Sequence, residues 1–193
     1  MKIENKRFSV REQARESIIY VRNSFGYIYS IIIIFFLSFL LGFIFPSNFS
    51  FLDEFLKDLI DKTINLNLFE LFLFIFQNNL QSAFFGLFLG IFFGIFPLIN
   101  SLTNGVVLGY VSSKVASEVS IIELWRIFPH GIFELPAIFI ALGLGLKLGF
   151  SIFPGKTKYL KSRLYNSANA FLFIIMPLLL IAALIESLFI MIG

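Results

Sequence analysis

Long apolar segments alternate with short polar ones along the chain. The apolar segments are residues 27–45, 68–96, 98–113, 123–147 and 169–192. A helix of about 20 apolar residues crosses the hydrocarbon core of a bilayer, so the pattern predicts an all-α, polytopic membrane protein with about five transmembrane helices. We expect the whole chain, residues 1–193, to form a single membrane domain. The link before residues 98–113 is short and uncharged, so that segment either crosses the membrane or re-enters it from one side.

Two further segments place apolar and charged residues on opposite faces of a helix. Residues 1–25 carry arginines on one face, and Ser9 with Glu12 forms a capping-box pattern at a helix start. Residues 49–66 carry an apolar stripe with acidic side chains opposite it. We expect the first helix to lie on the cytoplasmic surface of the membrane and the second on the extracytoplasmic surface.

Glycines at four-residue spacing predict where helices pack closely. A small residue at every fourth position lets two helix backbones approach each other in lipid. We expect the helix that ends near Phe96 to pack against the helix that begins near Leu98. The packing glycines are Gly86, Gly90, Gly94, Gly105 and Gly109.

The length of residues 68–96 makes a further prediction. As one helix they would be about 43 Å long, which exceeds the hydrocarbon core of about 30 Å. We therefore expect this helix to tilt, to protrude or to break near the amides of residues 77–81.

Composition excludes a soluble domain. Hydrophobic residues make up 58% of the chain and charged residues only 14%, whereas soluble domains are about 25% charged. The basic residues gather in residues 1–25 and 150–166, which the positive-inside rule explains better than nucleic-acid binding. This charge pattern predicts a multi-pass protein of the plasma membrane, surrounded by lipids, with a cytoplasmic N-terminus, a basic cytoplasmic loop and an extracytoplasmic C-terminus.

The apolar segment 123–147 also contains ionisable residues. Arg126, His130 and Glu134 are four residues apart, so a helix places them on one face. Helical rise puts His130 and Glu134 at a depth similar to that of the paired asparagines in residues 68–96. Buried polar groups without partners are costly in hydrocarbon, so we expect a shared cluster. Its members are Asn78, Asn79, Asn104, Arg126, His130 and Glu134.

Two prolines flank this cluster. Pro129 and Pro136 each lack a backbone N–H and clash with the carbonyl four residues earlier. We therefore expect the helix to be kinked or briefly unwound between them. Unwound backbone at membrane depth forms ion and substrate sites in many transporters.

Three interpretations of the cluster are open. In a structural interpretation, Arg126 pairs with an acidic neighbour and the amides join helices. In a transport interpretation, His130 and Glu134 bind a proton or an ion. In a hydrolytic interpretation, His130 binds a metal, but the chain has no cysteine and only one histidine, which are the commonest zinc ligands. We expect no catalytic residue, no metal site and no cofactor.

Three motifs follow one another along the chain: Asn78-Asn79 followed by the glycine ridge, Asn104-Gly105-x-x-x-Gly109, and Pro129-His130-Gly131-Ile-Phe-Glu134-Leu-Pro136-Ala137. In their order and spacing they resemble the stage II sporulation protein M family, and the resemblance extends over residues 15–192. The resemblance implies about five transmembrane helices and a cytoplasmic N-terminus. It also implies a scaffold function, because the sporulation member brings cell-wall-remodelling partners together at a membrane.

The two lines of argument lead to one expected function and one alternative. We expect a non-enzymatic integral membrane scaffold or partner-binding subunit with membrane or envelope protein partners, homodimeric through glycine ridges or the last span. The alternative is a small transporter or channel with an ion, proton or solute site at Asn78, Asn79, His130 and Glu134.

Overall fold

The computed structural model describes the backbone of residues 9–118 and 128–192 and the side chains of residues 9–117 and 134–191. Every regular element within these residues is helical, which confirms the predicted all-α class. The main helices are α1 (Val10–Arg22), α2 (Phe25–Ile44), α3 (Leu52–Thr63), α4 (Leu68–Phe88), α5 (Ile95–Glu118), α6 (Phe128–Gly149), α7 (Leu160–Ala170) and α8 (Met176–Ile192).

Several of these helices are long and apolar enough to cross a membrane. Within the described residues the qualifying segments are Phe25–Ile44, Leu68–Ile91, Ile95–Ser117 and Thr157–Met191. α6 has 22 residues and is therefore about 33 Å long, which also matches the hydrocarbon core. α5 runs without a break through the segment for which re-entry was an alternative.

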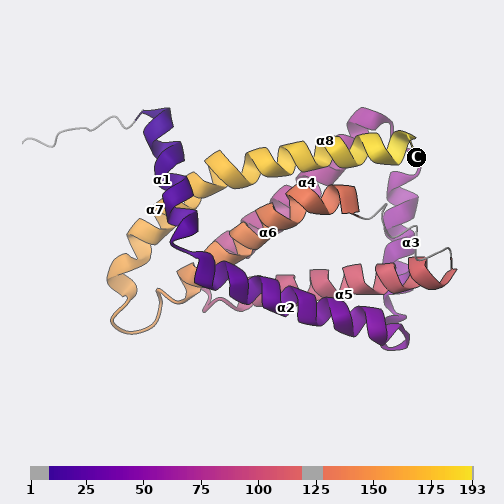
Figure 1. Cartoon of the computed structure of the whole chain (residues 1–193), viewed down its shortest axis with the longest axis horizontal. Coiled ribbons are helices and arrows are strands. Elements are labelled where there is room, and N and C mark those ends of the chain that lie inside the picture. Colours follow the sequence, from indigo (N-terminus) through magenta and orange to yellow (C-terminus); the bar gives the residue numbers. More distant parts are fainter. Residues whose placement is uncertain (1–8, 119–127, 193) are drawn as a thin grey trace, which may run out of the picture.

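The helices form two pairs with α6 between them (Figure 1). α2 packs along α5, α4 packs against α8, and α6 contacts all four. α1 and α7 lie together at one end of the bundle, where the basic residues gather, and we call this the basic end. α3 crosses the opposite end, beside the C-terminus, and runs across the direction of α2, α5 and α8 (Figure 1).

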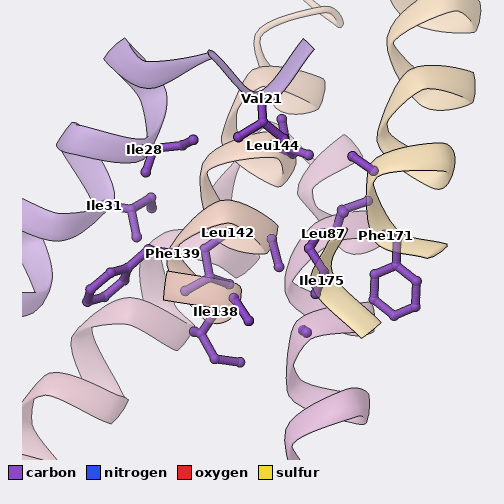
Figure 2. Packing of buried hydrophobic residues seen from close by; sticks show 14 of the residues in the cluster. Val21, Ile28, Ile31, Leu87, Ile138, Phe139, Leu142, Leu144, Phe171 and Ile175 are labelled. Atoms are coloured by element: carbon purple, nitrogen blue, oxygen red, sulfur yellow. The ribbon is translucent and has the colours of Figure 1, made fainter. Parts of the chain in front are cut away.

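α6 is the centre of the hydrophobic core. Nearly every residue from Ala137 to Gly149 is buried, as expected for a helix that is apolar on all sides. Ile28 and Ile31 of α2 approach it from one side, and Leu87 of α4 from another (Figure 2). A π-helical turn, Phe171–Ile175, adds Phe171 and Ile175 and joins α7 to α8.

The chain turns sharply between α4 and α5. α4 ends at Phe88 and a 3₁₀ turn, Leu89–Ile91, follows it. Phe93 and Gly94 then adopt positive φ angles of 57° and 75°, a conformation that ends a helix. The predicted helix 68–96 is thus shorter, and the break lies beyond the amides of residues 77–81.

Glycines allow the closest helix contacts, but with other partners than the sequence indicated. A Cβ at Gly105 or Gly109 of α5 would meet the backbone of α2 at Phe35 or Phe39. A Cβ at Gly86 of α4 or at Gly90 of the following 3₁₀ turn would meet α6, and one at Gly94 would meet Leu146 of α6. α4 and α5 therefore do not pack through these glycines on each other; each packs on a different neighbour.

The unwound segment expected between the two prolines is not present. The backbone of α6 is helical from Phe128 to Gly149 and passes through Pro136. Pro129 lies in the first turn, where a missing N–H breaks no helical hydrogen bond.

Helix caps explain two acidic residues close to apolar segments. Ser9 and Glu12 form the predicted capping box at the start of α1, with bonds of 2.8 and 3.2 Å. Asn67 and Glu70 form a second capping box at the start of α4. The Glu70 carboxylate thus accepts a hydrogen bond from the backbone N–H of Asn67 at the helix end.

α3 is attached to the bundle by polar contacts. None of its residues is buried, and among the described helices none packs closely along it. The hydroxyl of Tyr110 on α5 donates a 2.7 Å hydrogen bond to Asp53 of α3, and Lys114 forms a 3.0 Å ion pair with the same carboxylate. The hydrogen bond from Tyr110, with that from Lys114, holds the pKa of Asp53 below its usual value.

The glycine contacts predict a difference between two alanine substitutions. Gly109→Ala should lower the free energy of unfolding by about 1–3 kcal/mol, because the new methyl group meets the backbone of α2. Gly26→Ala should leave it unchanged or raise it by up to about 1 kcal/mol, since nothing lies within 4 Å of that Cβ. Chemical unfolding of the two variants in one detergent measures the difference, and equal effects would contradict the assigned packing.

The attachment of α3 should depend on pH. A lowered folded-state pKa means that the stabilisation by Asp53 is present above the ordinary pKa of about 4 and is lost as the pH falls below it. Asp53→Asn should therefore free α3 at neutral pH, as should acid in the wild type, and a spin label on Ile60→Cys would report the mobility. Asp58→Asn is the control, because Asp58 pairs only within α3, with Lys62. A label that stays immobile in Asp53→Asn would disprove the attachment.

Candidate functional site

Polar side chains occur in the middle of several helices that are long enough to span a membrane. Asn79 lies 11 residues after the start of α4, about 17 Å along the helix. α5 carries Asn100 and Asn104, α6 carries Glu134, and α8 carries Glu186. These residues form two groups that meet on α4.

The first group joins α4 to α6. The side chain of Asn79 lies close enough to the carboxyl group of Glu134 for the two to interact, and Asn79 is only 8% exposed. Asn78 donates from its Nδ2 to Oδ1 of Asn79 at 3.4 Å. Two of the residues that sequence spacing assigned to one cluster, Asn79 and Glu134, are therefore in direct contact.

Glu186 of α8 extends this group, and the sequence analysis did not include it. Its carboxyl group is close enough to that of Glu134 for the two to interact electrostatically. Its Oε2 is buried and has no hydrogen-bond partner among the described residues. The sequence contained a simple signal for this residue, because Glu186 is the only ionisable residue in the apolar segment 169–192.

The second group joins α4 to α5. Asn100 donates from Nδ2 to Oγ of Ser82 at 3.0 Å. Asn104 donates to Oδ1 of Asn100 at 2.7 Å and to its carbonyl at 3.0 Å. Asn100 thus connects Asn104 to Ser82, and Ser82 lies one helical turn after Asn78 on α4.

Parts of both groups are exposed at the level of the helix midpoints. Asn78 and Asn104 are exposed, and no hydrogen bond from a described residue reaches the Oδ1 atom of either. We call these two exposed side chains the amide surface. Of the remaining predicted members, Arg126 lies outside the described residues, and for His130 the structure describes only the backbone, in the first turn of α6.

The chemistry available to this site is hydrogen bonding and charge. Within the described side chains no three histidine, cysteine or acidic residues are placed to hold a metal ion. A groove of about 530 Å³ lies between α4 and α8, beside Ser187 and close in sequence to Glu186, but its lining is almost wholly apolar. Such a groove fits acyl chains or apolar side chains better than a polar substrate.

A second polar cluster, at the basic end, was not predicted. Lys147, in the last turn of α6, is 9% exposed, and its Nζ donates a 2.7 Å hydrogen bond to Ser24. The same Nζ lies 3.9 Å from the centre of the Tyr20 ring. Arg163 of α7 donates from Nη1 to the carbonyl of Lys147 and to Oγ of Ser151, both at 2.9 Å.

Apolar helices of membrane-spanning length, packed around a central helix with polar groups between them, define a polytopic α-helical membrane protein. The family model described as Stage II sporulation protein M matches residues 31–189, so the chain belongs to this family. The match covers most of the chain, including α4, α5, α6 and α8 with both polar groups. The resemblance seen in the sequence is thereby confirmed. No curated protein and no solved structure is significantly similar to the chain.

The contact between Asn79 and Glu134 predicts the effect of a substitution. Asn79→Leu should lower the free energy of unfolding by about 1–3 kcal/mol, because it leaves a buried carboxyl group without its partner. Gln77→Leu, on an exposed face of the same helix, should change it by less than about 0.5 kcal/mol. Unfolding in detergent micelles compares the two variants, and equal stability would show that the contact is unimportant.

Proposed function

We propose that this protein is a non-enzymatic membrane scaffold that binds transmembrane segments of partner proteins at the amide surface. The observation that carries the proposal is the exposure of Asn78 and Asn104 near the midpoints of α4 and α5. An amide oxygen without a partner is unfavourable in hydrocarbon by several kcal/mol. A polar or small residue on a partner helix supplies the missing hydrogen bonds.

The apolar surface of the bundle supports the same proposal. Only 28% of α2 and 28% of the α8 segment are buried within the chain. Large apolar side chains such as Phe36, Leu40 and Leu188 are therefore exposed. In a membrane such faces contact lipids or other transmembrane helices, so a partner can extend from the amide surface onto them. A second copy of the chain is one such partner, which makes a homodimer part of the proposal.

The charge distribution supports an orientation for this scaffold. α1 and α7 lie together at the basic end, and α3, with more acidic than basic residues, crosses the other end. The positive-inside rule then places the N-terminus in the cytoplasm and the C-terminus outside a plasma membrane. Envelope-side partners would in this orientation meet α3.

One observation favours a second function, proton or cation transport. Glu134 and Glu186 approach each other between α6 and α8, and neither has an ion pair with a basic described residue. Two such carboxyl groups are costly within a membrane unless they share a proton or bind a cation. Ionisable residues inside membranes commonly belong to proton or ion pathways.

Partner binding can be tested with a double variant that removes the amide surface. Asn78→Leu with Asn104→Leu should weaken partner binding by nearly tenfold, since each interhelical hydrogen bond contributes about 0.6 kcal/mol. Co-purification from native membranes with quantitative identification of the bound proteins, and of a second tagged copy, measures the loss. Thr103→Val is the matched control, because the Thr103 hydroxyl already bonds to carbonyls of its own helix.

The amide double variant and a second double variant at the two buried carboxyl groups together distinguish the two functions. If the protein is a scaffold, the amide double variant stays folded, loses its partners and changes no flux in proteoliposomes. If the protein is a transporter, Glu134→Gln with Glu186→Gln abolishes a proton or cation flux that the wild type catalyses. A partner set unchanged by the amide double variant, together with such a flux, would overturn the scaffold proposal.

A further inference from the structure

Two cations at the basic end are held by neutral partners. The ammonium group of Lys147 contacts the Ser24 hydroxyl and the Tyr20 ring. The guanidinium group of Arg163 contacts the Lys147 carbonyl and the Ser151 hydroxyl. The two charges are close enough to repel each other electrostatically. Within the described residues no carboxylate forms an ion pair with either.

The helix terminus offsets only part of this charge. Arg163 binds a carbonyl at the C-terminal end of α6, where the helix dipole amounts to about half a negative charge. The ring of Tyr20 adds a weak attraction to Lys147. Two full positive charges in a partly buried place thus keep an excess of positive charge, which favours an anion.

Hydrogen-bond donors are available for such an anion. Among the described residues, the bonds of Arg163 come from Nη1 only, which leaves Nε and Nη2. Lys147 makes one hydrogen bond with its three N–H groups. Arg163 is half-buried, so its remaining donors can reach a group at the surface of the bundle.

We propose that Lys147 and Arg163 form a binding site for the phosphate group of an anionic membrane lipid. Phosphate oxygens accept several hydrogen bonds from guanidinium and ammonium groups at once, and basic pockets between helices bind phosphate headgroups. The site lies at one end of the helices, where α1 and α7 meet α6, and headgroups are found at that level. Exposed Lys156, Lys158 and Lys161 follow in the same region and attract the headgroup from a distance.

This site is distinct from the amide surface and does not depend on the proposed function. It lies at the opposite end of α6 from Glu134. A lipid bound there would touch α1, α6 and α7, and would hold the amphipathic α1 against the membrane surface. Its chemistry is that of phosphate recognition, so free phosphate is the second possible source of the ligand.

The test titrates phosphatidylglycerol into the full chain purified in dodecyl maltoside, a detergent without phosphate. Native mass spectrometry counts the bound lipid, and thermal unfolding reports stabilisation. Arg163→Gln and, separately, Lys147→Gln should each weaken binding about fivefold, because each basic residue contributes about 1 kcal/mol to attraction by anionic lipid. Lys147→Gln keeps an N–H donor for Ser24, which protects the fold. Lys158→Gln removes the same charge from the exposed loop and should weaken binding less than about twofold.

Each result supports or overturns the proposal. Binding that falls equally in all three variants would mean general attraction to a basic surface, and binding unchanged in a folded Arg163→Gln or Lys147→Gln would exclude the site. If neither variant folds, a wild type that binds no more phosphatidylglycerol than diacylglycerol, which lacks the phosphate group, and is not stabilised by phosphatidylglycerol overturns the proposal. The remaining experiment is a titration with inorganic phosphate in the absence of lipid. Stabilisation by millimolar inorganic phosphate equal to that by the lipid would assign the site to free phosphate.

Discussion

The close contact between the backbones of α4 and α6 is the constraint on which the rest of the structure depends. Gly86 of α4 and Gly90 of the following 3₁₀ turn lie against Leu142 and Gly145 of α6, and a Cβ at Gly90 or Gly145 would meet backbone atoms of the facing segment. The two helices run in the same direction, so their register is fixed along their length. Two turns before this contact, the register places Asn79 opposite Glu134, where the two side chains interact. Close packing of small residues thus brings polar groups together in an otherwise apolar bundle.

The central position of α6 connects three polar regions of the molecule. Its first half carries Glu134, which meets α4 and α8, and its last turn carries Lys147, which meets α1 and α2. The third region, around Asp53, attaches α3 to α5 at the other end. Apolar packing stabilises the bundle between these regions, and polar contacts determine how the surface helices α1 and α3 are attached. A bundle built in this way presents one polar region among its apolar helices and one at each end.

The sequence predicted those features of the fold that depend on a local pattern of residues. Apolar length gave the all-α membrane fold, the Ser9–Glu12 spacing gave the start of α1, and glycine spacing gave residues at helix contacts. Glycine spacing did not predict which helices these glycines contact, because spacing within one helix defines a face but not the neighbour on that face. Gly145 and Gly149 of α6 have the same four-residue spacing as the predicted glycines. Their spacing marks a close-packing face on α6, and only the tertiary structure shows that this face meets α4.

Other features depend on tertiary structure, and the sequence contained only weak signals for them. Glu186 lies far along the chain from Glu134, and only the packing of α8 against α6 brings them together. In the sequence, Lys147 resembles an ordinary basic residue at the end of a transmembrane helix. It is buried because residues of α1 and α7 cover it. The break after α4 follows from positive φ angles at Phe93 and Gly94. A glycine allows such a turn, but a phenylalanine gives no signal for it.

The register of α4 and α6 can be measured directly, because the chain has no cysteine. In a lipid bilayer, Asn79→Cys paired with Glu134→Cys should react with a short thiol-to-thiol cross-linker, even though the interaction between the amide and the carboxyl group has been removed. Gln77→Cys paired with Glu134→Cys should not react, since Gln77 lies on another face of α4. Adding Gly145→Leu to the first pair should abolish its cross-link, because the side chain forces the helices apart. Equal cross-linking of both pairs, or a cross-link that survives Gly145→Leu, would contradict the account.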